Sequence, residues 1–153
     1  MRVTYGQGFA PAVTGRQRVE RLQEEVSKLP QYEPETTHTF HGGMYCREVR
    51  QCADSLVVGK VHKKDHMLVV LSGTMLITDG VSDAIEITGP KLICSKPGTK
   101  RSLYAVTDAA YMTVHVTDAT TVEDAENELV EADPASMFTI GNKIKVKELT
   151  WHS

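Results

Sequence analysis

The sequence has few aromatic residues, few cysteines and no long apolar run. Aromatic side chains make up only 6% of the chain. No apolar run approaches the ~20 residues that a membrane-spanning helix needs, which excludes a helical membrane protein. The three cysteines, Cys46, Cys52 and Cys94, are odd in number and lack metal-binding spacing, so we expect reduced thiols. Residues 1–12 lack the apolar centre of a secretory signal, which predicts a cytoplasmic protein.

Neither sign of charge is in large excess. The formal net charge of the 153 residues is -3, with 24% charged and 41% hydrophobic residues. This balance gives no general attraction to nucleic acid or to anionic membranes, so we expect neither as a partner. Length and composition are those of one globular domain with a sizeable core, and they exclude wholesale disorder.

The hydrophobic pattern divides this single domain into three zones, 1–37, 38–117 and 118–153. In the first zone, apolar residues recur at helical spacing between positions 14 and 29. Thr14 and Gln17 have the spacing of a capping box, and Pro30 supplies a stop. We therefore expect one amphipathic helix after a short N-terminal arm that contains Gly and Pro.

The middle zone has a different period, because short apolar segments alternate with turn residues such as Ser72-Gly73 and Asp79-Gly80. Short strands at roughly 8–12-residue spacing predict an all-β antiparallel barrel or sandwich rather than βαβ units. The expected strands are 44–49, 56–62, 67–71, 74–78, 84–87, 91–95, 102–106 and 111–116.

In the last zone, Thr121 is positioned to cap an acidic helix over residues 122–131, and Asp133-Pro134 ends that helix. A basic run with lysines at 143, 145 and 147 follows, and it is a candidate to lie against the acidic helix of its own chain or of a neighbouring copy. Exposed apolar side chains in the tail would be unfavourable on a free monomer, so we expect the tail to dock on its own barrel or on a neighbouring subunit. The candidate interface residues are Ile144, Val146, Leu149 and Trp151.

Two histidines, His62 and His66, lie close together between segments rich in valine. Such flanks favour two strands joined by a tight polar turn over a helix, and this turn brings both imidazoles to one barrel mouth. Neutral imidazoles bind zinc, nickel, manganese or iron, but a metal site needs at least a third protein ligand. The alternative is a pair of histidines that hydrogen-bond to the backbone.

The strand rhythm and the stretch from 60 to 73 resemble the first motif of the cupin superfamily. That motif is histidine, any residue, histidine, three or four residues, glutamate, six residues and glycine. Gly73 matches the glycine, His66 stands at the glutamate position, His62 at the second histidine and Lys60 at the first. The stretch from Pro97 to Arg101 resembles the second motif, and Arg101 stands where that motif has a histidine.

The resemblance covers residues 44–116 and, more narrowly, this stretch is similar to small single-domain cupins of tailed bacteriophages. It implies an all-β, cupin-like jelly roll, the double-stranded β-helix, with an N-terminal helix before it and a C-terminal helix plus extended tail after it. Cupins usually pair through their sheets, so the resemblance also implies a homo-oligomer.

Relative to the cupin motifs, the metal-ligand set is degenerate. His62 and His66 remain as ligand types, and His115 supplies a third imidazole if the more polar face of its strand points inward. Strand alternation leaves open whether that face lines a cavity or faces solvent. Lys60 and Arg101 occupy the other ligand positions and would repel a metal, but with the histidines they also suggest an anion pocket. The opposing interpretation is that the turn cations, Lys100 among them, are simply solvated.

Three functional hypotheses follow. The leading one is a phage-type cupin that acts as a structural or assembly protein, in the host cytoplasm or in a virion. Its arms would contact a second copy or other virion proteins, with no catalysis and no cofactor required. The first alternative is a metal-dependent isomerase or dioxygenase that acts on a small sugar or organic acid with Zn, Mn, Fe or Ni. The second is a cupin that binds a small molecule without catalysis.

Overall fold

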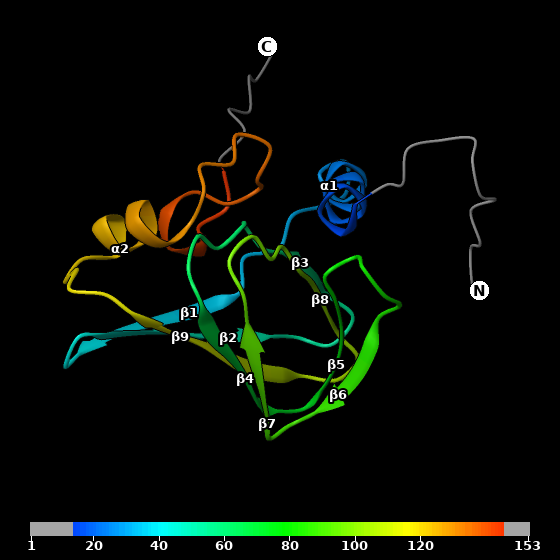
Figure 1. Cartoon of the computed structure of the whole chain (residues 1–153). Helices are drawn as coiled ribbons and strands as arrows, with labels where there is room; N and C mark the ends of the chain where they lie inside the picture. Colours follow the sequence, from blue (N-terminus) through cyan, green and yellow to red (C-terminus); the bar gives the residue numbers. More distant parts are fainter. Residues whose placement is uncertain (1–13, 146–153) are drawn as a thin grey trace, which may run out of the picture.

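A computed structural model of the chain describes residues 14–145, which form two antiparallel sheets that face each other (Figure 1). One sheet has the strand order β1-β2-β9-β4-β7, and the other has the order β3-β8-β5-β6. Most neighbours in each sheet are distant in sequence, which is the crossing pattern of a jelly roll, so the predicted all-β class is confirmed. The strands are β1 (Glu35–His41), β2 (Met44–Gln51), β3 (Leu56–Val58), β4 (His66–Ser72), β5 (Thr74–Thr78), β6 (Ile85–Thr88), β7 (Lys91–Ser95), β8 (Ser102–Ala105) and β9 (Ala109–Val116).

Two strands, β5 and β7, have the bounds that the sequence predicts. The sequence pattern does not predict β1, because its residues are mostly polar and alternate between exposed and half-buried positions. The predicted strand 56–62 is too long, since β3 ends at Val58. From there the backbone N–H of Gly59 donates to the carbonyl of Arg101 (2.9 Å), and His62 lies in the connection to β4 rather than at a strand end.

Both helices begin where the sequence places their caps. In α1 (Gly15–Val26), the Thr14 hydroxyl accepts from the backbone N–H of Gln17 (3.1 Å), and the Gln17 side chain accepts from the backbone N–H of Thr14 (3.0 Å). In α2 (Val122–Leu129), the Thr121 hydroxyl accepts from the backbone N–H of Asp124 (3.2 Å). A short 3-10 turn, η1 (Ile140–Asn142), follows α2.

Three apolar clusters hold these elements together. The main core fills the space between the sheets, with Val70, Met75 and Ala105 fully buried. A second cluster joins Val19 of α1 to β3 and to Phe138. A third, made of Tyr45, Ala125 and Leu129, lies under α2. The described residues on both sides of the predicted barrel therefore include side chains that pack on the barrel of their own chain.

The described part of the C-terminal tail contacts its own chain. Lys143 Nζ lies 3.5 Å from a carboxylate oxygen of Glu33, and Lys145 Nζ donates to the carbonyl of Pro134 (2.9 Å). Within the chain, these two lysines therefore contact Glu33 and Pro134 rather than the acidic helix, and contact with the acidic helix of a neighbouring copy stays a prediction. Ile144 packs against the cluster that contains Val19, within its own chain. The other predicted tail residues, Val146, Lys147, Leu149 and Trp151, lie outside the described residues.

The three cysteines form no disulfide, as expected; Cys46 is half-buried, and Cys52 and Cys94 are exposed. No helix among residues 14–145 has the length and the apolar composition that crossing a membrane requires.

Candidate metal centre

Strand pairing brings His115 and His66 together on the inner face of the five-stranded sheet. On one side of β9, His115 pairs with Tyr45 of β2. On the other side Met67 of β4 pairs with Val114, so the preceding residue, His66, neighbours His115. His115 is 3% exposed and His66 is 6% exposed. The more polar face of β9 therefore lines the barrel interior, which is the orientation that strand alternation left open.

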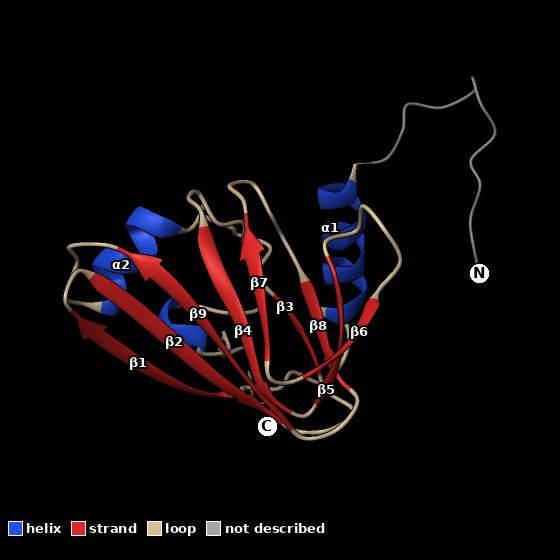
Figure 2. Ribbon diagram, turned by 60° about the horizontal axis from the view of Figure 1, so that its bottom comes forward, coloured by secondary structure: helices blue, strands red, loops and turns tan. Residues whose placement is uncertain are grey.

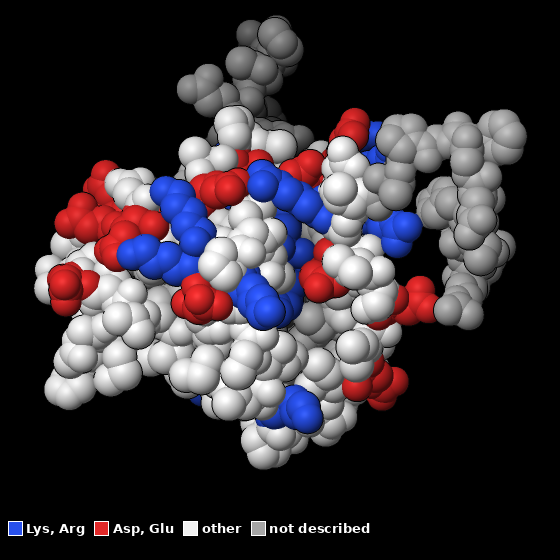
Figure 3. Space-filling view, in the orientation of Figure 1, with Lys and Arg blue, Asp and Glu red and all other residues white. Residues whose placement is uncertain are grey.

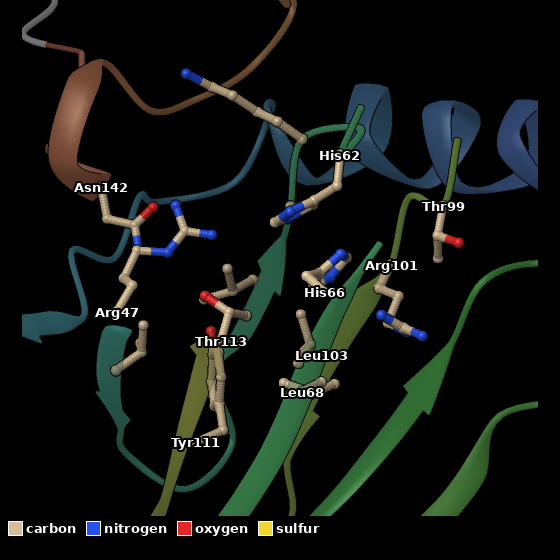
Figure 4. A pocket seen from close by; sticks show the side chains of 14 residues that line it. Arg47, His62, His66, Leu68, Thr99, Arg101, Leu103, Tyr111, Thr113 and Asn142 are labelled. Carbon is tan, nitrogen blue, oxygen red and sulfur yellow. The ribbon is translucent and has the colours of Figure 1, made fainter. Parts of the chain in front are cut away.

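His62 reaches the same place from the connection between β3 and β4. Its backbone N–H donates to the carbonyl of Thr99 (3.3 Å), and its carbonyl accepts from the N–H of Gly98 (2.8 Å). On its other side it forms a β-bridge with Val130, directly after α2. The turn around Gly98 and the C-terminal segment thus hold the His62 ring above that of His66 (Figure 4).

The imidazole rings of His62, His66 and His115 form one cluster. One nitrogen of each ring lies within 4.8 Å of the others. The ring centroids are 4.0 Å apart for His62 and His66 and 5.1 Å apart for each of the other two pairs. The rings are nearly parallel, with interplanar angles of 19°, 3° and 20°. The structure therefore brings together all three histidines that the sequence nominated.

The three rings are neutral near pH 7. Burial is the largest cause of the lowered pKa of each histidine, and the positive charge of Arg47 lowers all three further. For His115 the pKa falls to about 3. A hydrogen bond to the carbonyl of Lys64 opposes the shift at His66 but does not reverse it. Each neutral imidazole keeps one nitrogen lone pair, which a metal ion can accept.

The ring nitrogens of this cluster fit a divalent metal ion. His66 Nδ1 lies 3.3 Å from the carbonyl oxygen of Lys64, and because a carbonyl only accepts, Nδ1 carries the proton and Nε2 keeps the lone pair. His62 Nδ1 is buried and has no hydrogen-bond partner. A buried nitrogen of this kind suits a metal bond, since buried polar atoms are otherwise paired. Three histidines are a known donor set for zinc, and imidazole also suits iron and nickel.

The two cations that stand at cupin ligand positions, Lys60 and Arg101, line the cavity beside His62 and His66. Arg101 Nη1 donates to the hydroxyl of Ser95 (2.7 Å), and burial lowers the pKa of the guanidinium. Ser95 pairs with His66 across β7 and β4, so Arg101 lies next to the histidine row.

Lys100 behaves differently from its neighbour Arg101. Its side chain is 2% exposed, and its Nζ lies 2.7 Å from a carboxylate oxygen of Asp133. The interpretation of Lys100 as a solvated turn charge is therefore wrong. The ion pair connects the C-terminal segment, at Asp133, to the turn before Lys100 that hydrogen-bonds to His62.

Arg47 is a charged site residue that sequence reasoning missed. It lies on β2 between Tyr45 and Val49, on the same inner face, and its side chain is 15% exposed. Across the sheet it pairs with Thr113, one step along from the histidine row. The signal was present in the sequence, because alternation places Tyr45, Arg47 and Val49 on one face, and a cation between two buried apolar residues marks an unusual inward position.

Tyr45 connects the cluster to the sheet edge. Its ring stacks on His115, with centroids 5.8 Å apart, and its hydroxyl lies 2.6 Å from Nδ1 of His38. Burial raises the pKa of Tyr45 to about 12, so the phenol stays protonated near pH 7. This contact fixes the ring against which His115 rests.

Side chains that include those of Arg47, His62, His66 and Arg101 line a cavity at the barrel mouth (Figure 4). The cavity volume is about 50 Å³. No carboxylate is among the described residues that line it. The lining residues are Arg47, Val49, Val57, Gly59, Lys60, His62, His66, Leu68, Thr99, Arg101, Leu103, Tyr111, Thr113 and Asn142.

No family model and no curated protein matches this chain in sequence. Solved structures with a similar chain course include an RmlC-like cupin with a double-stranded β-helix fold from Methanocaldococcus jannaschii, at 8% identity over 55% of this chain and 80% of that chain, with a TM-score of 0.48. Another is a cupin superfamily protein from Desulfitobacterium hafniense, at 10% identity over 77% of this chain and 100% of that chain, with a TM-score of 0.46. Such likenesses concern the fold alone, and the jelly-roll assignment follows from the strand pairing given above.

Proposed function

We propose that the chain binds one divalent transition-metal ion through His62, His66 and His115, and that a small anionic molecule binds beside it. The observation that carries this proposal is the cluster of three neutral imidazoles, with nitrogens within 4.8 Å of one another and with His62 Nδ1 unpartnered. Arg101 and Lys60 supply positive charge at the same cavity, which favours an anionic ligand.

A metal ion bound here supplies Lewis acidity to an oxygen of the ligand. The protein's own contribution is positional: Arg101 holds an anionic group, and the apolar lining excludes water. Because no Asp or Glu is among the described residues of the cavity, acid–base catalysis has no carboxylate there. This favours ligand binding over the isomerase or dioxygenase alternative.

Elemental analysis after loading and dialysis tests the proposal. Full-length protein is treated with a chelator, loaded separately with Zn, Ni, Mn or Fe(II), and dialysed. We expect one ion per chain for at least one of these metals, and its loss in the His62→Ala, His66→Ala double variant. His41→Ala is the matched control, since His41 is exposed at the end of β1, and it should retain the metal. Wild-type protein that retains no metal contradicts the proposal.

A second candidate function, assembly, is supported by the outer face of the five-stranded sheet. We define this outer face by residues of β2, β9, β4 and β7 that the register places side by side. Figure 2 shows these strands side by side in front of α2, and much of the lower half of the molecule is uncharged in Figure 3. The outer-face residues are Met44, Cys46, Met67, Val69, Leu92, Cys94, Met112, Val114 and Val116.

The partner that suits this outer face is a second copy of the chain. Val116 is 78% exposed, Leu92 54% and Met67 39%, so the patch is apolar and open to solvent. Next to the patch, Glu48 and Arg50 form an ion pair with each other, with 3.3 Å between the charged atoms. These two residues therefore do not require an oppositely charged group on the partner. Four strands about 4.8 Å apart, with six residues rising about 3.4 Å each, give a flat footprint of about 400 Å². That footprint is about half of the ~800 Å² per partner that a standard-size interface buries.

Sedimentation equilibrium tests the self-association. We expect a mass of twice 16.9 kDa for the wild type and a shift towards 16.9 kDa for Met67→Lys. Leu29→Lys is the control, because Leu29 is 60% exposed but lies beyond α1 and away from the outer face. A monomeric wild type would contradict assembly through this face. The finer hypothesis, a virion component, is tested by mass spectrometry of purified phage particles.

A further inference from the structure

Arg47 carries a charge that its surroundings compensate only in part. Its side chain is 15% exposed, and its nearest carboxylate oxygen, on Glu126, is 3.8 Å away. That same oxygen already accepts from the backbone N–H of Gly141 (2.8 Å). Within residues 14–145 the Arg47 guanidinium makes no hydrogen bond, although it has five N–H donors. A buried guanidinium with its donors unused is costly unless a ligand binds them.

Thr113 presents a second unused polar group at the same place. It pairs directly with Arg47 across β2 and β9, and both side chains line the cavity. Its hydroxyl oxygen is buried and has no hydrogen-bond partner. The hydroxyl and the guanidinium together can donate to one carboxylate, which accepts several hydrogen bonds in a planar arrangement.

Arg101 offers a matching group on the other side. Figure 4 shows Arg47 and Arg101 on opposite sides of His62 and His66. Of the Arg101 donors, Nη1 bonds to Ser95, and the guanidinium lines the same cavity. Between the two arginines, the cavity floor is apolar and includes Leu68 and Leu103. The cavity therefore has two anion-binding ends and an apolar middle.

We infer that the ligand of this cavity is a short-chain dicarboxylate. One carboxylate binds Arg47 and Thr113, the other binds Arg101, and the hydrocarbon between them contacts the apolar floor. Two negative charges match two guanidiniums, whereas a monocarboxylate leaves one of them uncompensated. A sugar does not fit this pattern, because its many hydroxyls need partners that an apolar floor does not supply. This inference names the ligand class of the cavity in the proposed function, and it does not require the metal.

Calorimetric titration of full-length protein, both metal-free and zinc-loaded, tests the inference with succinate and glutarate as probes and butyrate as the monocarboxylate. We expect the better dicarboxylate to bind at least about tenfold more tightly than butyrate, the effect of one further charge-assisted hydrogen-bonded contact. Arg47→Gln should reduce the affinity for the dicarboxylate to about that for butyrate. Arg50→Gln, on the same strand but on the outer face, should leave it unchanged.

Thr113→Val provides a variant that nearly preserves the side-chain shape and removes only the hydroxyl. It should fold like the wild type and still weaken dicarboxylate binding. Equal affinities for the dicarboxylates and butyrate, no binding of either dicarboxylate, or full affinity in Arg47→Gln would each overturn the inference. Metal content separates the two proposals: Arg47→Gln should keep the metal and lose the dicarboxylate. A wild type that binds the dicarboxylate but no metal refutes only the metal proposal.

Discussion

Replacing Asp133 with asparagine should destabilise the protein, because the buried ammonium group of Lys100 then has no counter-charge. Lys100 Nζ lies 2.7 Å from Asp133 Oδ2, in an ion pair whose lysine is 2% exposed and whose aspartate is 15% exposed. The same carboxylate oxygen accepts from Gln23 of α1 at 3.3 Å. Asp133 therefore joins the N-terminal helix, the turn at Lys100 and the C-terminal segment. Asparagine keeps the shape of this contact but removes the charge.

The expected loss is about 3–5 kcal/mol of unfolding free energy, the usual cost of leaving one partner of a buried ion pair uncompensated. Lys100→Met should cost less, because an apolar side chain fills a buried position and Asp133 keeps its bond to the N–H of Ala135 (3.1 Å). Burial alone would raise the pKa of Asp133, but the hydrogen bond and charge of Lys100 outweigh it and lower the pKa. The contribution is therefore complete above the ordinary aspartate pKa and is lost as the pH falls through the lowered pKa of the folded state.

Urea unfolding at pH 7 and at acidic pH measures this difference. Glu25→Gln serves as the control, because its ion pair with Lys28 is exposed on both sides and should contribute less than about 0.5 kcal/mol. The difference between wild type and Asp133→Asn should shrink at low pH, where the wild-type carboxylate also loses its charge. A cost below about 1 kcal/mol at pH 7, or a cost independent of pH, would refute the assignment of Asp133 as the counter-charge of a buried lysine.

Two further predictions concern the walls of the barrel. Tyr45→Phe removes the 2.6 Å contact with His38 and should lower the unfolding free energy, measured in urea, by about 1 kcal/mol. Gly73→Ala should cost more than Gly98→Ala, although both glycines have positive φ angles, of 80° and 85°. A Cβ at Gly73 overlaps the carbonyl oxygen of Asp108, whereas one at Gly98 meets nothing within 4 Å; equal thermal shifts for the two variants would contradict this.

Much of the fold was predictable because local sequence signals agree with the final structure. Turn residues separate β5 and β7 from the neighbouring segments of the chain, and the apolar residues of β5 and β7 directly indicate strands. The β1 strand lacked such a signal, since pairing with β2 rather than burial of apolar side chains holds it in place. The bend after Val58 depends on a bond between Gly59 and Arg101, which are far apart in sequence. Contacts of that kind are invisible to any local pattern.

The candidate site, like the fold, was predictable from the sequence only in part. The spacing of His62 and His66 and the position of His115 on a strand were enough to nominate the histidine cluster. What the spacing did not reveal was charge: Arg47 lowers the pKa of all three histidines, yet it lies on a different strand from each of them. Its role depends on the register of β2 against β9, which places it opposite Thr113. Register is a tertiary property, so the sequence analysis did not identify Arg47 as part of the site.

The C-terminal segment changes how the residues outside the barrel are understood. From the sequence they form an arm suited to contacts with other proteins. In the structure, Val130 bridges to His62, Glu126 lies beside Arg47, and Asn142 lines the cavity. Residues of this segment thus position a candidate metal ligand and close one wall of the cavity. The described residues of this segment are accounted for by contacts within their own chain, so the case for assembly depends on the outer face of the five-stranded sheet and not on the length of the chain beyond the barrel.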